Sequence, residues 1–252
     1  MAGHSKWSKI KRTKGALDVK RGKLFSQLSK EITIATRLGG GNPGFNPRLR
    51  AAIQSAKSQS MPADNIDRAM KKGTGELESQ AVEEIIYEAY APGGVALVIE
   101  TATDNRNRTA AELRNAMTKN DGNLGSSGSV AFMFHRKGQI TVPVATVDED
   151  RLLEIVLEAG AEEFSTEDDT FIVTTPVEQL YNVAGALKSA GVECESEKLT
   201  FIPENTVVVE DPGTAAQVLK LCDALEDLED VTSVHANFDI SDDVLAETQA
   251  PA

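Results

Sequence analysis

Apolar positions in the first seventy residues recur at helical spacing. Between residues 16 and 38 they return every three or four positions, which predicts one long amphipathic helix that ends at the glycines of 39–41. Asn46, followed by proline, predicts the capped start of a second helix, and Pro62 predicts the start of a third. Small inward residues on all three helices predict a compact helical domain over residues 1–74.

The pattern then changes from helical to strand spacing. Two predicted strands, Ile85 to Tyr90 and Val95 to Thr101, flank Pro92-Gly93-Gly94 and indicate a hairpin, and a helix is expected from Thr109 to Lys119. A Gly/Ser-rich loop over 121–129 separates this helix from a further strand expected at 130–134. These elements predict a mixed layer of sheet and helix.

Residues 137–203 have an order of elements of their own. Strand, helix, strand, strand, helix and strand follow one another, which is the ferredoxin-like pattern. We interpret 136–203 as a ferredoxin-like domain inserted into a central α+β domain made of 75–135 and 204–240. The late helix and strand of that domain are expected to complete the sheet begun near residue 84. The chain is therefore expected to be α+β, and 241–252 a frayed tail.

Charge is distributed unevenly along the 252-residue chain. The formal net charge is −13, yet residues 1–72 hold 16 Lys and Arg against 4 Asp and Glu, and the remainder holds 10 against 35. A cationic front end indicates a polyanionic partner, DNA or RNA, which the acidic remainder repels. The alternative of another class is a charge-polarised protein-interaction adaptor.

Residues 3–15 show neither helical nor strand spacing and are interpreted as a flexible basic arm. Its cations suit phosphates and its indole suits a base or sugar, which predicts nucleic-acid contacts. The alternatives are a solubilising tail and an indole that packs back on the helical domain. The predicted contact residues of the arm are Lys6, Trp7, Lys9, Lys11, Arg12 and Lys14.

The long helix carries a second set of candidate phosphate contacts. Lys23, Lys30 and Arg37 stand seven residues apart and so share one face, about 21 Å long, that points away from the apolar stripe. We predict that this face binds phosphates together with Lys20 and Arg21. The alternative is an ordinary solvated helix face.

Two arginines at the start of the expected central helix form a third set. Arg106 and Arg108 oppose the positive end of a helix dipole, and an oxyanion bound there would relieve the conflict. Backbone N–H groups of loop 122–128 could assist. The alternative is that Asp104 and Glu112 simply pair with these arginines.

Other classes of function leave no pattern in the sequence. Two cysteines exclude a disulfide framework, scattered histidines exclude a zinc site, and no apolar run suits a membrane span. Phosphate-loop, dinucleotide and nucleophile-elbow motifs are missing, so we expect no enzyme, cofactor, metal or small-molecule substrate. A phosphoester enzyme at Arg106 and Arg108 is a third hypothesis, which requires turnover.

Several segments together resemble the YebC family over about residues 2–240. They are Ala2-Gly3-His4-Ser5-Lys6-Trp7, Ile10-Lys11, Asp18-Val19-Lys20-Arg21, Asn46-Pro47-Arg48-Leu49-Arg50, Met61-Pro62-Ala63-Asp64-Asn65-Ile66, Tyr90 to Ala96, Thr103 to Thr109, Gly122-Asn123-Leu124-Gly125, Gly128-Ser129-Val130 and Asn237-Phe238-Asp239-Ile240. His235 and Met117 depart from the family pattern, where Tyr and Phe are usual, and both look like packing positions.

The resemblance implies three domains and a cytoplasmic, non-enzymatic regulator of gene expression. Bacterial members of that family are described as transcriptional regulators that bind DNA. Other members act on translation at the ribosome, and the mitochondrial relatives activate translation of a cytochrome oxidase subunit. The resemblance thus implies a DNA-binding regulator, with a ribosome- or RNA-binding translation factor as the alternative.

Overall fold

The computed structural model describes residues 17–78, 81–167 and 169–249, with side chains from residue 22 to residue 248 in these ranges. The chain divides into two compact units. One is Phe134–Glu204, and the other is formed by the sequence before and after it. The class is α+β, as the sequence predicts.

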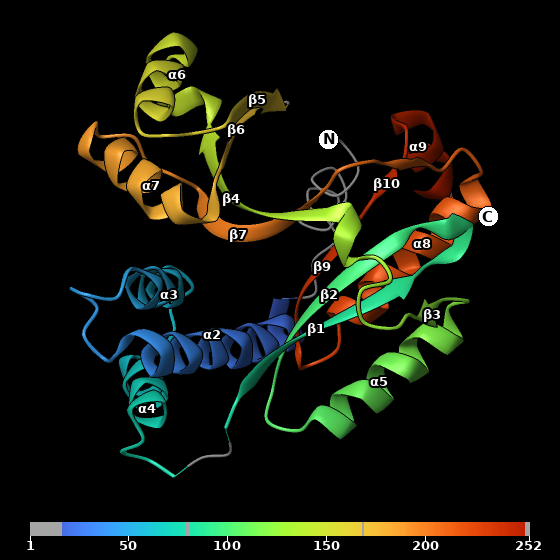
Figure 1. Cartoon of the computed structure of the whole chain (residues 1–252), viewed down its shortest axis with the longest axis horizontal. Helices are drawn as coiled ribbons and strands as arrows, with labels where there is room; N and C mark the ends of the chain where they lie inside the picture. Colours follow the sequence, from blue (N-terminus) through green and yellow to red (C-terminus); the bar gives the residue numbers. More distant parts are fainter. Residues whose placement is uncertain (1–16, 79–80, 168, 250–252) are drawn as a thin grey trace. The chain divides into compact units, whose positions relative to one another are not determined.

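Within residues 17–74, which the structure describes, three helices form the N-terminal part of the larger unit, as predicted. Helix α2 (Leu17–Gly39) lies between α3 (Pro47–Ser58) and α4 (Ala63–Thr74), as Figure 1 shows. The Asn46 side chain caps α3 by accepting a hydrogen bond from Leu49 N at 3.0 Å. The small shared core consists of Leu28, Ile32, Ala35, Leu49, Ala52, Ala56, Met61, Ile66 and Ala69.

Helices α2 and α4 approach each other closely at one glycine. A Cβ atom added to Gly73 would lie 2.5 Å from Thr36 Cβ and 2.6 Å from the backbone oxygen of Thr33. Nearby, Thr33 Oγ1 donates to Ala69 O at 3.1 Å across the same helix pair. The close approach therefore depends on a residue without a side chain.

The central sheet is antiparallel, with strand order β3-β1-β2-β9. The predicted hairpin at Pro92–Gly94 is confirmed, and Gly93 and Gly94 both take φ +75° there. The late strand also completes the sheet as expected, because β9 pairs with β2. The strands are β1 (Glu83–Tyr90), β2 (Ala96–Thr103), β3 (Asn123–Leu124) and β9 (Val231–Ala236).

Helices α5 (Arg106–Lys119) and α8 (Pro212–Glu226) supply further residues of the central core. Asn105 caps α5, so the helix begins three residues earlier than the sequence predicts. Strands β8 (Val207–Val208) and β10 (Phe238–Asp239) form a short parallel pair.

Two expectations about local structure are wrong. The frayed tail contains helix α9 (Asp242–Gln249), which begins after Ser241 and buries Leu245 against the central core. The strand expected at 130–134 is instead a 3-10 turn, Ala131–Met133, and strand β4 (Phe134–Pro143) begins only after it. In both places a short apolar pattern was too brief to fix the type of element.

The smaller unit has the predicted ferredoxin-like order of elements. Its sheet runs β5-β6-β4-β7, all neighbours are antiparallel, and two helices share the core with it. The elements are β4, α6 (Glu149–Glu158), β5 (Glu163–Glu167), β6 (Thr170–Thr175), α7 (Leu180–Ser189) and β7 (Ser196–Pro203), with 3-10 turns at Val144–Thr146 and Val177–Gln179.

Candidate nucleic-acid interface

Part of the predicted interface lies outside the described residues. This holds for the arm residues Lys6, Trp7, Lys9, Lys11, Arg12 and Lys14, and for the side chains of Lys20 and Arg21. The remaining predicted contacts, on α2 and at the start of α5, have defined surroundings.

Lys30 is held by a carboxylate from the far end of the chain. Its Nζ lies 2.7 Å from Asp230 Oδ1 and 3.4 Å from the backbone oxygen of Glu229. The Lys30 side chain is 15% exposed and that of Asp230 only 1%. Lys30 therefore neutralises a buried anion of its own chain.

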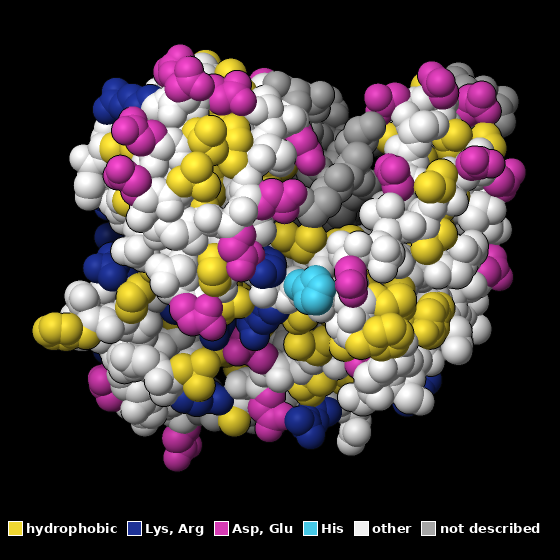
Figure 2. All heavy atoms as spheres, turned by 45° about the horizontal axis from the view of Figure 1, so that its top comes forward, with side chains coloured by type: hydrophobic (Ala, Val, Ile, Leu, Met, Phe, Trp, Pro, Cys, Tyr) yellow, Lys and Arg dark blue, Asp and Glu magenta, His cyan; other side chains and the backbone are white. Residues whose placement is uncertain are grey.

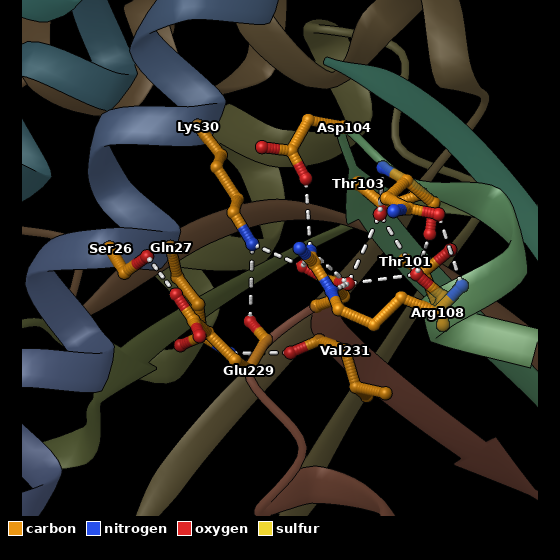
Figure 3. Close-up of polar contacts among 12 residues, drawn as sticks. Ser26, Gln27, Lys30, Thr101, Thr103, Asp104, Arg108, Glu229 and Val231 are labelled. Carbon is orange, nitrogen blue, oxygen red and sulfur yellow. Dashed lines mark hydrogen bonds and ion pairs between the residues drawn. The ribbon is translucent and has the colours of Figure 1, made fainter. Parts of the chain in front are cut away.

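Asp230 also binds the second predicted cation, Arg108. Figure 3 shows Lys30 from α2 and Arg108 from α5 pointing toward one another. Both side chains form an ion pair with the carboxylate of Asp230. Arg108 Nη2 lies 2.7 Å from Asp230 Oδ2, and the hydroxyls of Thr109 and Thr103 lie 2.8 and 3.1 Å from the same oxygen. We call Lys30, Thr103, Arg108, Thr109 and Asp230 the Asp230 cluster.

The protonation of Asp230 follows from these contacts. Burial alone raises the pKa of a carboxyl, but hydrogen bonds from Lys30, Arg108 and Thr109 outweigh it and hold the pKa of Asp230 at about 2. The carboxylate is thus charged at any physiological pH.

Helix α2 makes further contacts with the central sheet. Gln27 Nε2 donates to Val231 O at 2.6 Å, and Arg37 Nη1 donates to Val82 O at 2.9 Å. The Lys23 ammonium nitrogen is buried. Arg48 of α3 adds a bridge, because its guanidinium binds both Glu31 and Glu84.

The prediction of an open stripe is wrong for Lys23 and Lys30, because the Lys23 nitrogen is buried and Lys30 is bound to Asp230, whereas Arg37 is exposed and donates to a backbone carbonyl. Helical spacing does place the three on one face, but that face contacts the central sheet. The prediction assumes that the side of α2 opposite its apolar stripe faces solvent, but the central sheet covers that side. The covering residues lie as far along the chain as Asp230, and the spacing of apolar residues within α2 cannot identify them.

The expected oxyanion site at the start of α5 is filled from within. Arg106 Nε lies 2.7 Å from Glu83 Oε2. Arg108 Nη2 lies 2.9 Å from Asp104 Oδ1, in addition to its ion pair with Asp230. Pairing with Asp104 is the alternative stated above and is confirmed, whereas the second expected partner, Glu112, takes no part in a described ion pair. Carboxylates of the chain thus relieve the conflict with the dipole.

The Gly/Ser-rich loop binds an anion of the chain too. Backbone N–H groups of Gly128, Val130 and Ala131 donate to the Glu88 carboxylate at 2.5 to 2.7 Å. Burial raises the pKa of Glu88, but these backbone donors outweigh it and leave the pKa below its ordinary value. Loop donors expected for a phosphate therefore hold Glu88.

A different set of cations faces solvent. Arg50 and Lys57 lie on one flank of α3, and Arg68 and Lys72 lie on the outer side of α4. All four residues are exposed, and within the described part of the chain none of them forms an ion pair. We call these four the α3/α4 cations. The sequence analysis did not select these four residues as a site.

One aromatic residue stands beside these helices without a core to fill. Phe45 directly precedes the Asn46 cap of α3, and its side chain is 87% exposed. Exposure of a large apolar ring is unfavourable unless it serves a contact. Sequence periodicity gave no signal for it, because it lies in a loop.

No described helix has the length and apolarity to span a membrane. Among the described residues, no group of three or more His, Cys, Asp or Glu is placed to hold a metal ion.

The chain matches two models of protein families. Residues 5–76 match the N-terminal domain of TACO1/YebC proteins, and residues 82–238 match the second and third domain of the same proteins. Together the two matches cover most of the chain.

Individual relatives are similar over nearly their whole length. A "Probable transcriptional regulatory protein" of Chlorobaculum tepidum is 53% identical, over 98% of each chain, and one of Aquifex aeolicus is 52% identical over 97% of this chain and 98% of its own. The crystal structure of a conserved hypothetical protein from Aquifex aeolicus superimposes with a TM-score of 0.83 at 52% identity, covering 89% of this chain and 93% of that one. The chain belongs to the TACO1/YebC family.

Proposed function

We propose that this chain is a non-enzymatic, nucleic-acid-binding regulator of gene expression that works in the cytoplasm. The observation that carries the proposal is the exposure of the α3/α4 cations without carboxylate partners among the described residues. Such cations bind phosphates by releasing counterions. Duplex DNA is the first ligand to test, because relatives are named probable transcriptional regulatory proteins.

The distribution of charge supports binding at the helical end. Residues 32–63 contain four cations and no Asp or Glu. The chain after residue 72, in contrast, holds 35 Asp and Glu against 10 Lys and Arg, and Figure 2 shows many such carboxylates at the surface, with some Lys and Arg among them. A phosphate backbone would be attracted to the first region and repelled by the second. The basic arm of residues 3–15 adds cations at the same end of the sequence.

We propose a non-enzymatic function because both arginines of α5 form ion pairs with carboxylates of the chain. The alternative of a phosphoester enzyme needs Arg106 and Arg108 available for a substrate phosphate. Glu83 binds the first, while Asp104 and Asp230 bind the second. Neutralised guanidinium groups are poor stabilisers of charge that develops on a transferring phosphoryl group.

RNA, including ribosomal RNA, is the second candidate ligand. Phosphate contacts alone do not distinguish it from DNA. The exposed ring of Phe45 favours RNA, because single-stranded loops offer bases for aromatic stacking whereas a duplex does not.

The test measures binding of the full chain to a 30-base-pair duplex, to an RNA hairpin and to ribosomes, over a range of salt concentrations. We expect log affinity to fall linearly with log salt. Replacing all four α3/α4 cations by Gln should make the slope shallower by about 3 to 4 on duplex DNA.

A matched control variant removes the same charge elsewhere. Arg114, Lys119, Lys188 and Lys220 are exposed and form no ion pair within the described residues, and their replacement by Gln should leave the slope unchanged. If the wild-type chain binds none of the three probes, or binds them independently of salt, the proposal is wrong. Binding of a basic protein with no nucleic-acid binding would support the adaptor.

A further inference from the structure

We propose that Phe45 is a stacking platform for an unpaired base of single-stranded nucleic acid. The inference rests on the nucleic-acid binding proposed above and adds to it the kind of nucleotide that is recognised. It follows from the exposure of the ring, from the way the loop is held, and from the charge around it.

The usual reason for an apolar residue at this position is missing. Phe45 stands one residue before the Asn46 cap, where an apolar side chain ordinarily packs on the fourth residue of the helix. That residue is Arg50, which is exposed, and the Phe45 ring is left 87% exposed. The ring thus contributes little to the folding of α3.

The loop that presents the ring is well braced. Gly44 N donates to Asn42 Oδ1 at 2.8 Å, and Phe45 N donates to Asn42 O at 3.1 Å. The neighbouring Asn46 side chain is buried and donates to Ala35 O at 2.7 Å and to Gly40 O at 2.9 Å. The backbone on both sides of the ring is therefore fixed, which lowers the entropy lost when a ligand binds.

A glycine makes room for this brace. A Cβ atom on Gly39 would lie 2.6 Å from Asn46 Nδ2 and 2.7 Å from Asn46 Cγ. The end of α2 and the start of α3 are thus joined through Asn46, directly beside Phe45.

The charge of the segment that carries the ring, residues 32–63, favours a polyanionic ligand. Arg50, on the helix that Phe45 precedes, is exposed and forms no ion pair among the described residues, and no Asp or Glu occurs between residues 32 and 63. An exposed aromatic ring in a cationic segment is the combination that binds single strands, with bases on the ring and phosphates on the cations. An apolar peptide would instead desolvate Arg50 without giving it a partner.

The experiment compares Phe45→Leu, which keeps an apolar side chain but removes the π face, with Phe45→Trp, which keeps the face. The probes are a 12-nucleotide single strand, as RNA and as DNA of the same sequence, and the matched duplex, each labelled with fluorescein. The full chain is titrated into each probe and anisotropy is recorded.

We expect Phe45→Leu to weaken single-strand binding about tenfold, Phe45→Trp to retain it, and both to bind the duplex within about twofold of wild type. Phe132→Leu is the control, because the Phe132 ring is also exposed, at 71%, but lies outside residues 32–63. This variant should bind each probe as the wild type does. The RNA and DNA arms show which single strand is preferred.

The outcomes separate this inference from the proposed function. If the wild-type chain binds the probes and Phe45→Leu binds all of them equally well, stacking is wrong while nucleic-acid binding stands. Equal losses on single strand and duplex would also overturn stacking, since a duplex hides its base faces. If the wild-type chain binds no probe, the proposed function fails first.

Discussion

Lys30 Nζ lies 2.7 Å from the carboxylate of Asp230, a residue 200 positions later in the sequence. This pair fastens the long N-terminal helix to the start of strand β9, and Arg108 binds the same carboxylate from α5. Three elements that meet at one buried anion are held in a fixed relation, because moving any of them leaves a charge unpaired. The pair therefore explains why Lys30, expected on a solvent-exposed face, is largely buried: it neutralises the Asp230 carboxylate.

Removal of the shared anion should destabilise the fold. Asp230→Ala removes the carboxylate that Lys30 and Arg108 share and leaves Arg108 with Asp104 alone, so we expect the free energy of unfolding to fall by about 3 kcal/mol. Urea unfolding followed by circular dichroism measures it. Asp227→Ala, at an exposed carboxylate three residues earlier, should change the stability by no more than about 0.5 kcal/mol. Equal stability of the two variants would show that the Asp230 cluster is not a structural anchor.

The same carboxylate predicts a dependence of stability on pH. Asp230 has a folded pKa of about 2, below the ordinary value near 4. A lowered folded pKa gives stabilisation that is complete above the ordinary pKa and is lost as the pH falls from about 4 toward 2. We expect the gap in unfolding free energy between wild type and Asp230→Asn to be constant from pH 7 to 5 and to narrow below pH 4. A gap that stays constant down to pH 2.5 would contradict the assignment.

Local features were predictable from the sequence, and contacts between distant elements were not. Helix caps such as Asn46, the hairpin at Pro92–Gly94 and the ferredoxin-like order all depend on residues close together in the chain. The environment of Lys30 depends on Asp230, and no pattern of neighbouring residues in the sequence pairs these two side chains. The same reason hid the role of Glu88, which binds a loop forty residues later.

The contact between α2 and α4 should not tolerate a methyl group. Gly73→Ala places a Cβ atom against the Thr33 backbone oxygen, which cannot rotate away, so we expect a loss of about 1 to 3 kcal/mol in unfolding free energy. Gly22→Ala is the matched control in α2, where nothing lies within 4 Å of the added atom. That substitution should stabilise the helix by about 0.5 to 1 kcal/mol. Thermal unfolding of both variants tests the prediction, and similar shifts in the same direction would refute it.

The Gly/Ser-rich loop should loosen when its anchor loses its charge. Glu88→Gln replaces an acceptor of three backbone N–H groups by an amide with a single acceptor oxygen. We expect amide hydrogens of Gly128 and Val130 to exchange faster and the unfolding free energy to fall by about 1 to 3 kcal/mol. Glu78→Gln, at an exposed position, is the control. Unchanged exchange in Glu88→Gln would mean that the loop is held by other contacts.

Two lysines of the helical region should separate stability from binding. Lys30→Gln breaks the contact with Asp230 and should lower the unfolding free energy by about 2 kcal/mol or more, while the slope of log affinity against log salt stays as in wild type. Lys57→Gln removes an exposed cation with no described ion-pair partner, so stability should change by less than about 0.5 kcal/mol while the slope on duplex DNA becomes shallower by about 1. Urea unfolding and anisotropy titrations at four salt concentrations give both quantities for each variant. The opposite result, a shallower slope of log affinity against log salt for Lys30→Gln and an unchanged slope for Lys57→Gln, would contradict this prediction. It would mean that α2 binds phosphate and that Lys30 leaves Asp230 when nucleic acid binds.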